Sequence, residues 1–325
     1  METLRSIFAL CCALLISSCK SNEAPVVSDD STTGIVPVSF MADSAFVHIE
    51  KQCSYGARVP GSKAHAECAT YIMNTFRRYG LQVSTQQTTV RGWDGKNLPC
   101  LNITASYLPD SSRRVVIATH WESRPWADQD PNAANHRLPV PAANDGASGV
   151  AVMLETARLL AELQPSVGVD FVCFDVEDYG TPYWGESPAD GSDWCLGSQY
   201  WSTHLPEDYR PLYGILLDMV GGSDTHFRYE YFSRRYAEPI VAKVWGAAAM
   251  VGADDYFLPE DGTAATDDHI PMNERAGIPT IDIIGTRPQG FSETWHTLAD
   301  TPQNISRQAL YAVGQTLLQV LYEEK

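Results

Sequence analysis

Four short runs of β-branched and aromatic residues constrain the fold of this chain more than any other feature. They are VVIAT at 115–119, VDFVCF at 169–174, YGILLD at 213–218 and PTIDII at 279–284. None of the runs alternates regularly between apolar and polar residues, which is typical of strands that are buried on both faces. We therefore expect four buried strands.

Segments with helical periodicity separate and flank these runs. The clearest is GASGVAVMLETARLLAEL at 146–163, where apolar residues recur along one stripe, and others lie at 65–79, 235–251 and 303–323. Strands that alternate with helices of this length require crossover connections. The sequence therefore predicts an α/β fold with a mostly parallel central sheet and helices on both of its faces.

The N-terminus reads as an export signal. Arg5 precedes an apolar run at 7–16 that is too short to span a membrane, and the ending ISSC resembles the lipobox of bacterial lipoproteins. We expect a signal peptide at 1–18, a lipidated disordered tether at 19–37 and a catalytic domain at 38–325. The protein would then be exported and anchored through Cys19 to a bacterial membrane, which we expect to be the outer membrane. The alternative is a plain secretory signal that is cut nearby.

The charge of the chain bears on its partners. The formal net charge is −17 and the isoelectric point is near 4.8. Binding to a phosphate backbone requires clustered Lys and Arg, which this sequence lacks, so we expect no nucleic-acid partner. A small molecule or a peptide is the expected partner.

Polar residues gather directly after the predicted strands. They are His120, Glu177 with Asp178, Asp218 and His296, while Asp145 stands just before the helical segment at 146–163. Because ligands bind at the carboxyl ends of strands in an open α/β sheet, these side chains should converge on one site. Two histidines and several carboxylates without a thiolate suit a catalytic zinc ion. The alternative is that these residues serve in turns and helix caps.

Seven segments, taken in order, carry a resemblance to a known family. They are PGSKAHAECATYIM, ATHWESRP, NDGASGVAVMLETARLL, CFDVEDYG, LLDMVG, TDDHIPM and FSETWHTLAD. Together they resemble the animal-type glutaminyl-peptide cyclotransferases, which belong to the zinc aminopeptidase superfamily. The resemblance runs from about Phe40 to the C-terminus and implies a zinc aminopeptidase-like (phosphorylase/hydrolase-like) fold.

The resemblance also implies roles for individual residues. Asp145, Asp178 and His296 would hold one catalytic Zn²⁺ per chain, and Glu177 would be the general acid/base. Asp218 and either Asp268 or Asp267 would hydrogen-bond near the leaving amide, with Asp268 taken here. Trp295 would line the pocket together with Trp184 or Trp194, of which we favour Trp184. The family usually has Glu-Glu where this chain has Glu177-Asp178, and the shorter side chain keeps the same ligand oxygen.

The expected reaction is zinc-dependent cyclisation of the N-terminal glutaminyl residue of a peptide to pyroglutamate, with release of ammonia. The nearest alternative is a zinc aminopeptidase of the same fold, for which His120 and Asp218 would be ligands of a second metal. Against it, the chain has His120-Trp121-Glu122 where the peptidase pattern is His-x-Asp. A more distant alternative is a surface lipoprotein that only binds peptides or glycans, but the candidate general base Glu177 is present.

Overall fold

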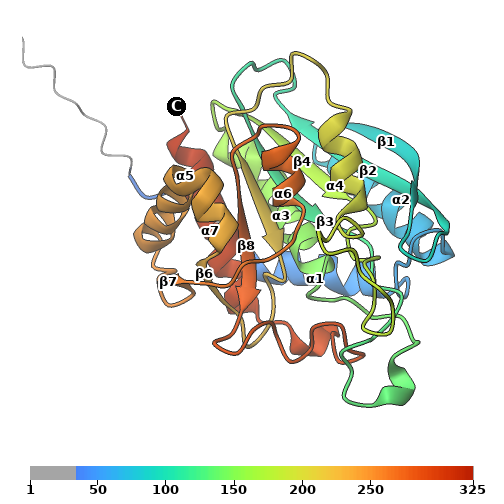
Figure 1. Ribbon diagram of the computed structural model, residues 1–325. Helices are drawn as coiled ribbons and strands as arrows, with labels where there is room; N and C mark the ends of the chain where they lie inside the picture. Colours follow the sequence, from blue (N-terminus) through green and yellow to red (C-terminus); the bar gives the residue numbers. More distant parts are fainter. Residues whose placement is uncertain (1–33, 325) are drawn as a thin grey trace, which may run out of the picture. The chain divides into compact units, whose positions relative to one another are not determined.

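The computed structural model describes residues 34–324, which are built around one eight-stranded sheet with the strand order β1-β2-β4-β3-β5-β8-β6-β7 (Figure 1). The strands are β1 (Gln82–Arg91), β2 (Asn97–Tyr107), β3 (Arg114–His120), β4 (Gly168–Phe174), β5 (Gly214–Asp218), β6 (His226–Tyr229), β7 (Phe257–Asp261) and β8 (Thr280–Thr286). The helices are α1 (Ala42–Cys53), α2 (Lys63–Arg78), α3 (Ala147–Leu163), α4 (Leu196–Thr203), α5 (Tyr231–Met250), α6 (His269–Glu274) and α7 (Arg307–Glu323), with short 3-10 turns at Ala133–Asn135 and Pro302–Asn304.

The four predicted strands form the middle of the sheet. They are β3, β4, β5 and β8, and the pairs β3–β4, β3–β5 and β5–β8 are all parallel. The prediction of a mostly parallel central sheet is confirmed. The sheet is mixed at its edges, because β1 and β2 form an antiparallel pair next to β4, and β6 pairs antiparallel with β8.

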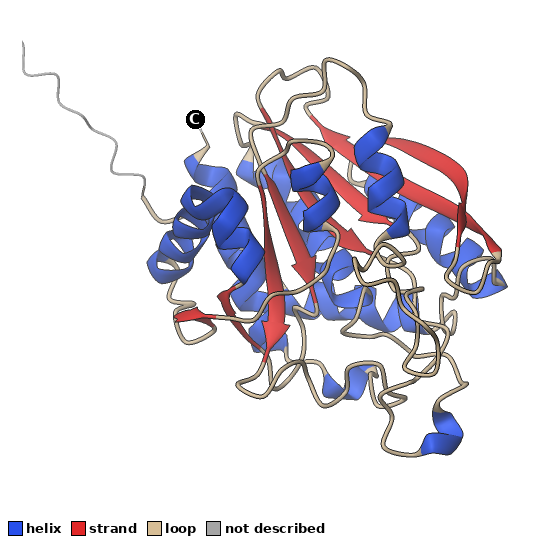
Figure 2. Cartoon of the chain, in the orientation of Figure 1, coloured by secondary structure: helices blue, strands red, loops and turns tan. Residues whose placement is uncertain are grey.

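Helices cover both faces of the sheet, as expected (Figure 2). Side chains on a strand point alternately to opposite faces, so the buried strands contribute to two separate apolar clusters. In β3, Val115 and Ile117 belong to the large cluster that contains apolar side chains of α1, α2, α3 and α7. Val116 and Ala118 belong to the smaller cluster that contains Trp201 of α4 and Met272 of α6.

The packed part of the described chain begins before residue 38, where the sequence placed the start of the domain. Val36 is buried, and its backbone N–H donates to Gln319 Oε1 of α7 at 2.7 Å. A short apolar stretch at 35–38 therefore extends the domain into the expected tether. The predicted signal peptide and Cys19 lie outside the described residues. Between residues 34 and 324, we find no helix that combines the length and apolar character needed to cross a bilayer.

The central parallel strands all end at the same edge of the sheet. In Figure 1 the arrowhead of β8 points to this edge, where the long loops that follow the strands also lie. The topology therefore brings together segments that are far apart in the sequence, among them those that contain His120, Glu177 with Asp178, Asp218 and His296.

Candidate metal centre and active site

The structure brings the predicted metal ligands together. His296 Nε2 lies 3.1 Å from Asp178 Oδ1 and 3.5 Å from Asp145 Oδ2. All three residues are buried, and one oxygen of each carboxylate, Asp145 Oδ2 and Asp178 Oδ2, has no hydrogen-bond partner. We name Asp145, Asp178 and His296 the ligand triad.

The ligand triad fits a zinc ion. Ligands at zinc distances of about 2.0–2.1 Å in tetrahedral geometry lie about 3.3 Å apart, and the observed separations of 3.1 and 3.5 Å bracket this value. One imidazole and two carboxylates, with a fourth position for water or substrate, form a donor set that is typical of catalytic zinc.

A second group of donors adjoins the first and shares Asp145 with it. His120 Nε2 lies 2.9 Å from Asp145 Oδ1 and 3.4 Å from Asp218 Oδ1. These three residues also come close enough together to hold a metal ion. Asp145 and Asp218 line the cavity described below, as does His296, whereas His120 does not.

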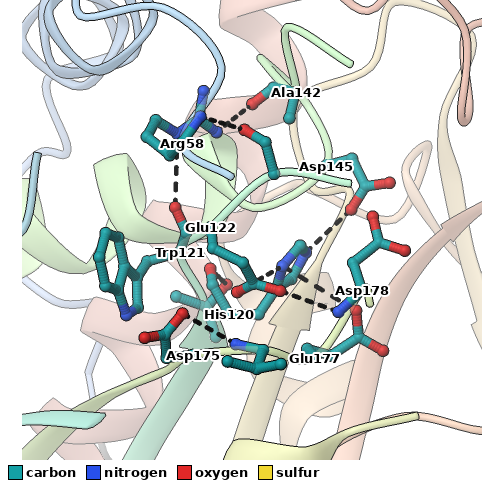
Figure 3. A network of polar contacts seen from close by, with 12 residues as sticks. Arg58, His120, Trp121, Glu122, Ala142, Asp145, Asp175, Glu177 and Asp178 are labelled. Atoms are coloured by element: carbon teal, nitrogen blue, oxygen red, sulfur yellow. Dashed lines mark hydrogen bonds and ion pairs between the residues drawn. The ribbon is translucent and has the colours of Figure 1, made fainter. Parts of the chain in front are cut away.

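Surrounding residues hold the ligands in place. The backbone N–H groups of Asn144 and Asp145 donate to the two oxygens of Asp300 at 2.8 and 3.0 Å. The backbone N–H of Asp178 donates to Glu122 Oε1 at 2.8 Å, and Glu122 Oε2 lies 3.6 Å from His120 Nδ1. Figure 3 shows the His120 side chain between Asp145 and Glu122. Glu122 is the residue that differs from the His-x-Asp pattern of the peptidases. Its carboxylate contacts one residue of each donor group, Asp178 and His120.

The backbone is strained around the site. Val176, Cys195, Met219 and His296 all have left-handed φ values between 50° and 57°. Such values are unfavourable for residues with a side chain, above all for a β-branched one, and strain of this kind clusters at functional sites. Gly146 also has a positive φ of 92°, and a Cβ there would lie 2.9 Å from Glu122 O, so the turn next to Asp145 requires glycine.

The ligand triad faces a small cavity of about 50 Å³. One side of this cavity is acidic, with Glu177, Asp218 and Asp267 next to the triad, and the other is apolar. The apolar wall consists of Trp194, Met219, Ala265, Ile284, Phe291 and Trp295. The Trp295 ring stacks on the His296 imidazole with 3.8 Å between centroids, so ligand and wall are neighbours in space as well as in sequence.

Trp184, which the sequence favoured as a pocket residue, does not line this cavity. Trp184 packs edge-on against Trp126 at 6.3 Å, and the Arg137 guanidinium lies 3.8 Å above its ring. Trp194 lines the cavity instead. Both tryptophans belong to one irregular loop, whose path decides which ring faces the site.

Of the two adjacent aspartates left open by the sequence, Asp267 and Asp268, only Asp267 lines the cavity. Asp267 lines the cavity, whereas Asp268 is fully buried and accepts a hydrogen bond from Ser198 Oγ at 2.5 Å. Asp268 is the N-cap residue of α6 and has helical backbone angles, so its side chain points in a different direction from that of Asp267. Asp267 is therefore the better candidate for the position beside the ligand triad.

The carboxyl groups on the acidic side of the cavity, Glu177, Asp218 and Asp267, all have a raised pKa. Burial raises the pKa of the Glu177 carboxyl well above its ordinary value; His120 opposes this effect, and Asp178 and Asp267 reinforce it. Burial, with the charge of Asp218, raises the pKa of Asp267 to about 7. The acidic side of the cavity therefore contains carboxyl groups that are able to carry protons at neutral pH.

Sequence reasoning missed several residues around the site. Arg124, Asp128 and Asp300 are buried next to the ligand triad, and Cys195 Sγ lies 3.5 Å from Glu177 Oε1. None of them belongs to a periodic segment. Arg124 follows β3 as closely as Asp178 follows β4, but no signal singled it out because an arginine is not a candidate metal ligand.

A larger hollow of about 540 Å³ lies away from this chemistry, lined in part by the first residue of β3. Its buried charged side chains bind each other: Arg114 Nη2 donates to Asp170 Oδ1 at 2.8 Å, and Tyr209 Oη donates to Asp170 Oδ2 at 2.7 Å. These groups are not available to a ligand, so we place the active site at the small cavity.

Comparison with known proteins identifies the family of this chain. Residues 102–321 match peptidase family M28. Aminopeptidase YwaD of Bacillus subtilis strain 168 is 30% identical over 220 residues, which make up 64% of this chain and 40% of that protein. The chain thus spans less than half of the length of this relative.

Two further relatives are glutaminyl cyclases. The glutaminyl-peptide cyclotransferase of Bos taurus is 25% identical over 289 residues, or 80% of this chain and 76% of the relative. The crystal structure of Bacteroides thetaiotaomicron glutaminyl cyclase bound to N-acetylhistamine is 44% identical, with a TM-score of 0.87, and covers 89% of this chain and 99% of its own. The resemblance to this family and the predicted fold class are confirmed.

Proposed function

This chain belongs to peptidase family M28, and on this basis we propose that it is a zinc-dependent glutaminyl cyclase. It converts the N-terminal glutaminyl residue of a peptide to pyroglutamate and releases ammonia. The observation that carries the proposal is the shape of the site: a ligand triad and a buried glutamate face a small cavity that is walled by Trp194 and Trp295. The relatives at 44% and 25% identity that are glutaminyl cyclases support it.

The reaction is an internal acyl transfer. The α-amine nitrogen of the substrate forms a bond to its own γ-carbonyl carbon, and the bond from that carbon to the γ-amide nitrogen breaks. The proton lost by the amine must reach the departing nitrogen, which then leaves as ammonia. A zinc ion held by Asp145, Asp178 and His296 would polarise the γ-carbonyl group and stabilise negative charge on its oxygen.

Glu177 is the proposed proton carrier. It lies next to the ligand triad, lines the cavity and is not one of the triad's donors. A carboxylate in this position takes the proton from the attacking amine and returns it to the leaving nitrogen. Asp218 and Asp267 line the same side of the cavity and are the proposed hydrogen-bond acceptors for the leaving amide.

The aromatic wall has the role of holding the substrate in a bent conformation. Attack is intramolecular, so a tight cavity that fixes the folded-back side chain lowers the barrier by orientation. Trp194, Phe291 and Trp295 supply flat apolar surfaces, and they offer no nucleophile that competes with the amine. They also limit the room for a water molecule, which would hydrolyse the amide instead.

The alternative function is that of an aminopeptidase, and the second donor group favours it. His120, Asp145 and Asp218 could hold a second metal ion, as a two-metal peptidase requires. We propose a single zinc ion, because the ligand triad faces the cavity and His120 does not.

Zinc content and product formation separate the two functions. We expect one zinc ion per chain and release of ammonia from Gln-Xaa peptides, with no cleavage of Leu-Xaa peptides. Two zinc ions per chain, free leucine from Leu-Xaa and no ammonia from Gln-Xaa would establish the aminopeptidase instead.

The lipid anchor is a separate proposal that depends on the sequence Ile16-Ser17-Ser18-Cys19 alone. Acylation of Cys19 would place the enzyme at a bacterial membrane after export. Cys19→Ala should abolish fatty-acid labelling and membrane association. Labelling that persists in this variant would refute the anchor without affecting the enzyme assignment.

A further inference from the structure

Arg124 is a fully buried cation that the proposed reaction does not use. Its side chain is 1% exposed and follows β3 by four residues. Nε and Nη2 donate to the two oxygens of Asp128, each at 2.7 Å, in a bidentate pair. This geometry is specific to the planar guanidinium group.

The remaining nitrogen of Arg124 reaches a member of the ligand triad. Nη1 donates to Asp178 Oδ1 at 3.2 Å and to the Asp178 carbonyl oxygen at 3.0 Å. It also lies 3.3 Å from the carbonyl oxygen of Gly180. The Arg124 side chain thus restrains both the carboxylate of Asp178 and the backbone at 178–180.

The partner of Arg124 reaches a second member of the triad. Asp128 Oδ1 lies 3.6 Å from His296 Nδ1, on the side of the imidazole that is opposite to Nε2. A carboxylate at Nδ1 favours the proton there, which leaves Nε2 free to bind a metal ion. The Arg124–Asp128 pair therefore contacts two of the three ligands from outside the triad.

Arg124 also supports the aromatic wall. Its Cζ atom lies 4.9 Å from the centre of the Trp194 ring and 5.5 Å from that of Trp126. A guanidinium group at this distance from an indole face is attracted to it and restricts its movement. The same cation thus touches the ligand set on one side and the substrate wall on the other.

We propose that Arg124 is a positioning residue that aligns Asp178 and His296 for zinc and holds Trp194 against the substrate. The part of this proposal that concerns the substrate rests on the glutaminyl cyclase function, whereas the part that concerns zinc does not. Lysine cannot replace Arg124, because an ammonium group cannot make the bidentate pair with Asp128 while it also donates to Asp178.

Arg114 provides a matched control. It is buried at the other end of β3, forms a bidentate pair with Asp170 and donates to three backbone carbonyl oxygens. It therefore repeats the environment of Arg124 without any contact to the site. Arg114→Lys and Arg114→Gln should lower the melting temperature and leave the zinc Kd unchanged.

The test compares these controls with Arg124→Lys and Arg124→Gln. For each purified variant, the zinc Kd is measured by competition with a chromophoric chelator, and KM and kcat are measured with a Gln-Xaa peptide. Both Arg124 variants should bind zinc about 10- to 100-fold more weakly, which is the usual effect of losing an outer-shell partner. When zinc is saturating, the KM of the Arg124 variants should still be higher than that of the wild type, because the Trp194 ring no longer contacts a guanidinium group.

Asp128→Asn serves as the second variant in case the Arg124 variants do not fold. It keeps the guanidinium group and should also weaken zinc binding, because the contact with His296 Nδ1 loses its charge. An unchanged zinc Kd in the folded variants at 124 and 128 would overturn the proposal. An equally large loss of zinc affinity in the Arg114 variants would also overturn the proposal. If the wild-type protein binds zinc but releases no ammonia, the proposed function fails, and the comparison of zinc affinities still decides the role of Arg124.

Discussion

Replacement of Glu177 by glutamine tests the division of roles between Glu177 and its neighbour Asp178. Glutamine has the same shape as glutamate, so the fold and the packing next to Cys195 should be kept. It cannot accept and return a proton at neutral pH. Because Glu177 lies outside the ligand triad, Glu177→Gln should also keep its zinc.

The size of the effect follows from the role. A positioned proton carrier contributes about 10²- to 10⁴-fold, or about 3–5 kcal/mol of transition-state stabilisation, so kcat should fall by this factor. KM should change little, because the lost interaction is made only in the transition state. Ammonia release gives kcat and KM, and elemental analysis gives zinc per chain. Asp178→Asn is the control and should lose zinc together with activity. A zinc-loaded Glu177→Gln protein that keeps most of its kcat would refute the proton-carrier role.

Three further predictions concern the wall, the core and the stability of the protein. Trp295→Ala should damage cyclisation more than zinc binding, because Trp295 lines the cavity without being a ligand; an equal loss of both would contradict its role as a wall. Phe171→Ala should lower the free energy of unfolding by about 3–5 kcal/mol in denaturant titrations, because Phe171 is fully buried against Phe76, and a cost below about 1 kcal/mol would contradict this packing. Burial, opposed by Glu155, lowers the pKa of His48 to about 4 from 6.5, so the unfolded chain binds one more proton between these pH values and stability falls as pH drops from 6.5 to 4. As pH drops from 6.5 to 4, the free energy of unfolding of His48→Gln should fall by about 3 kcal/mol less than that of the wild type. If the stability of the two proteins changed in parallel with pH, the lowered pKa of His48 would be contradicted.

The centre of the fold could be predicted because its strands are buried on both faces. Continuous apolar runs such as VVIAT gave β3, β4, β5 and β8, together with their parallel pairing. The edge strands could not be predicted in this way. β1 has the sequence QVSTQQTTVR and is largely exposed, and β6 is only four residues long, so neither carries a clear apolar pattern.

The residues of the candidate site also fall into a group that could be predicted from the sequence and a group that could not. His120, Glu177, Asp178 and Asp218 could be located because each ends or closely follows a buried strand, and the topology then brings them together. Which tryptophan of Trp184 and Trp194 lines the cavity, and which aspartate of Asp267 and Asp268, could not be predicted. These residues lie in irregular segments, where side-chain direction depends on local dihedral angles rather than on a repeating pattern.

The residues around the ligands were missed for a related reason. Arg124 and Asp128 are part of a long connection between β3 and α3, and their importance comes only from contacts with Asp178 and His296 far along the chain. Sequence reasoning could therefore point to candidate ligands of the metal but not to the residues that hold these candidates in place.

The products formed from one peptide with an N-terminal glutamine test the central claim most directly. Cyclisation and aminopeptidase cleavage compete for this substrate and give products of different mass. A glutaminyl cyclase should yield a peptide that has lost one ammonia and keeps every peptide bond, as seen by mass spectrometry. Free glutamine together with a peptide shortened by one residue would contradict the account and identify the protein as an aminopeptidase.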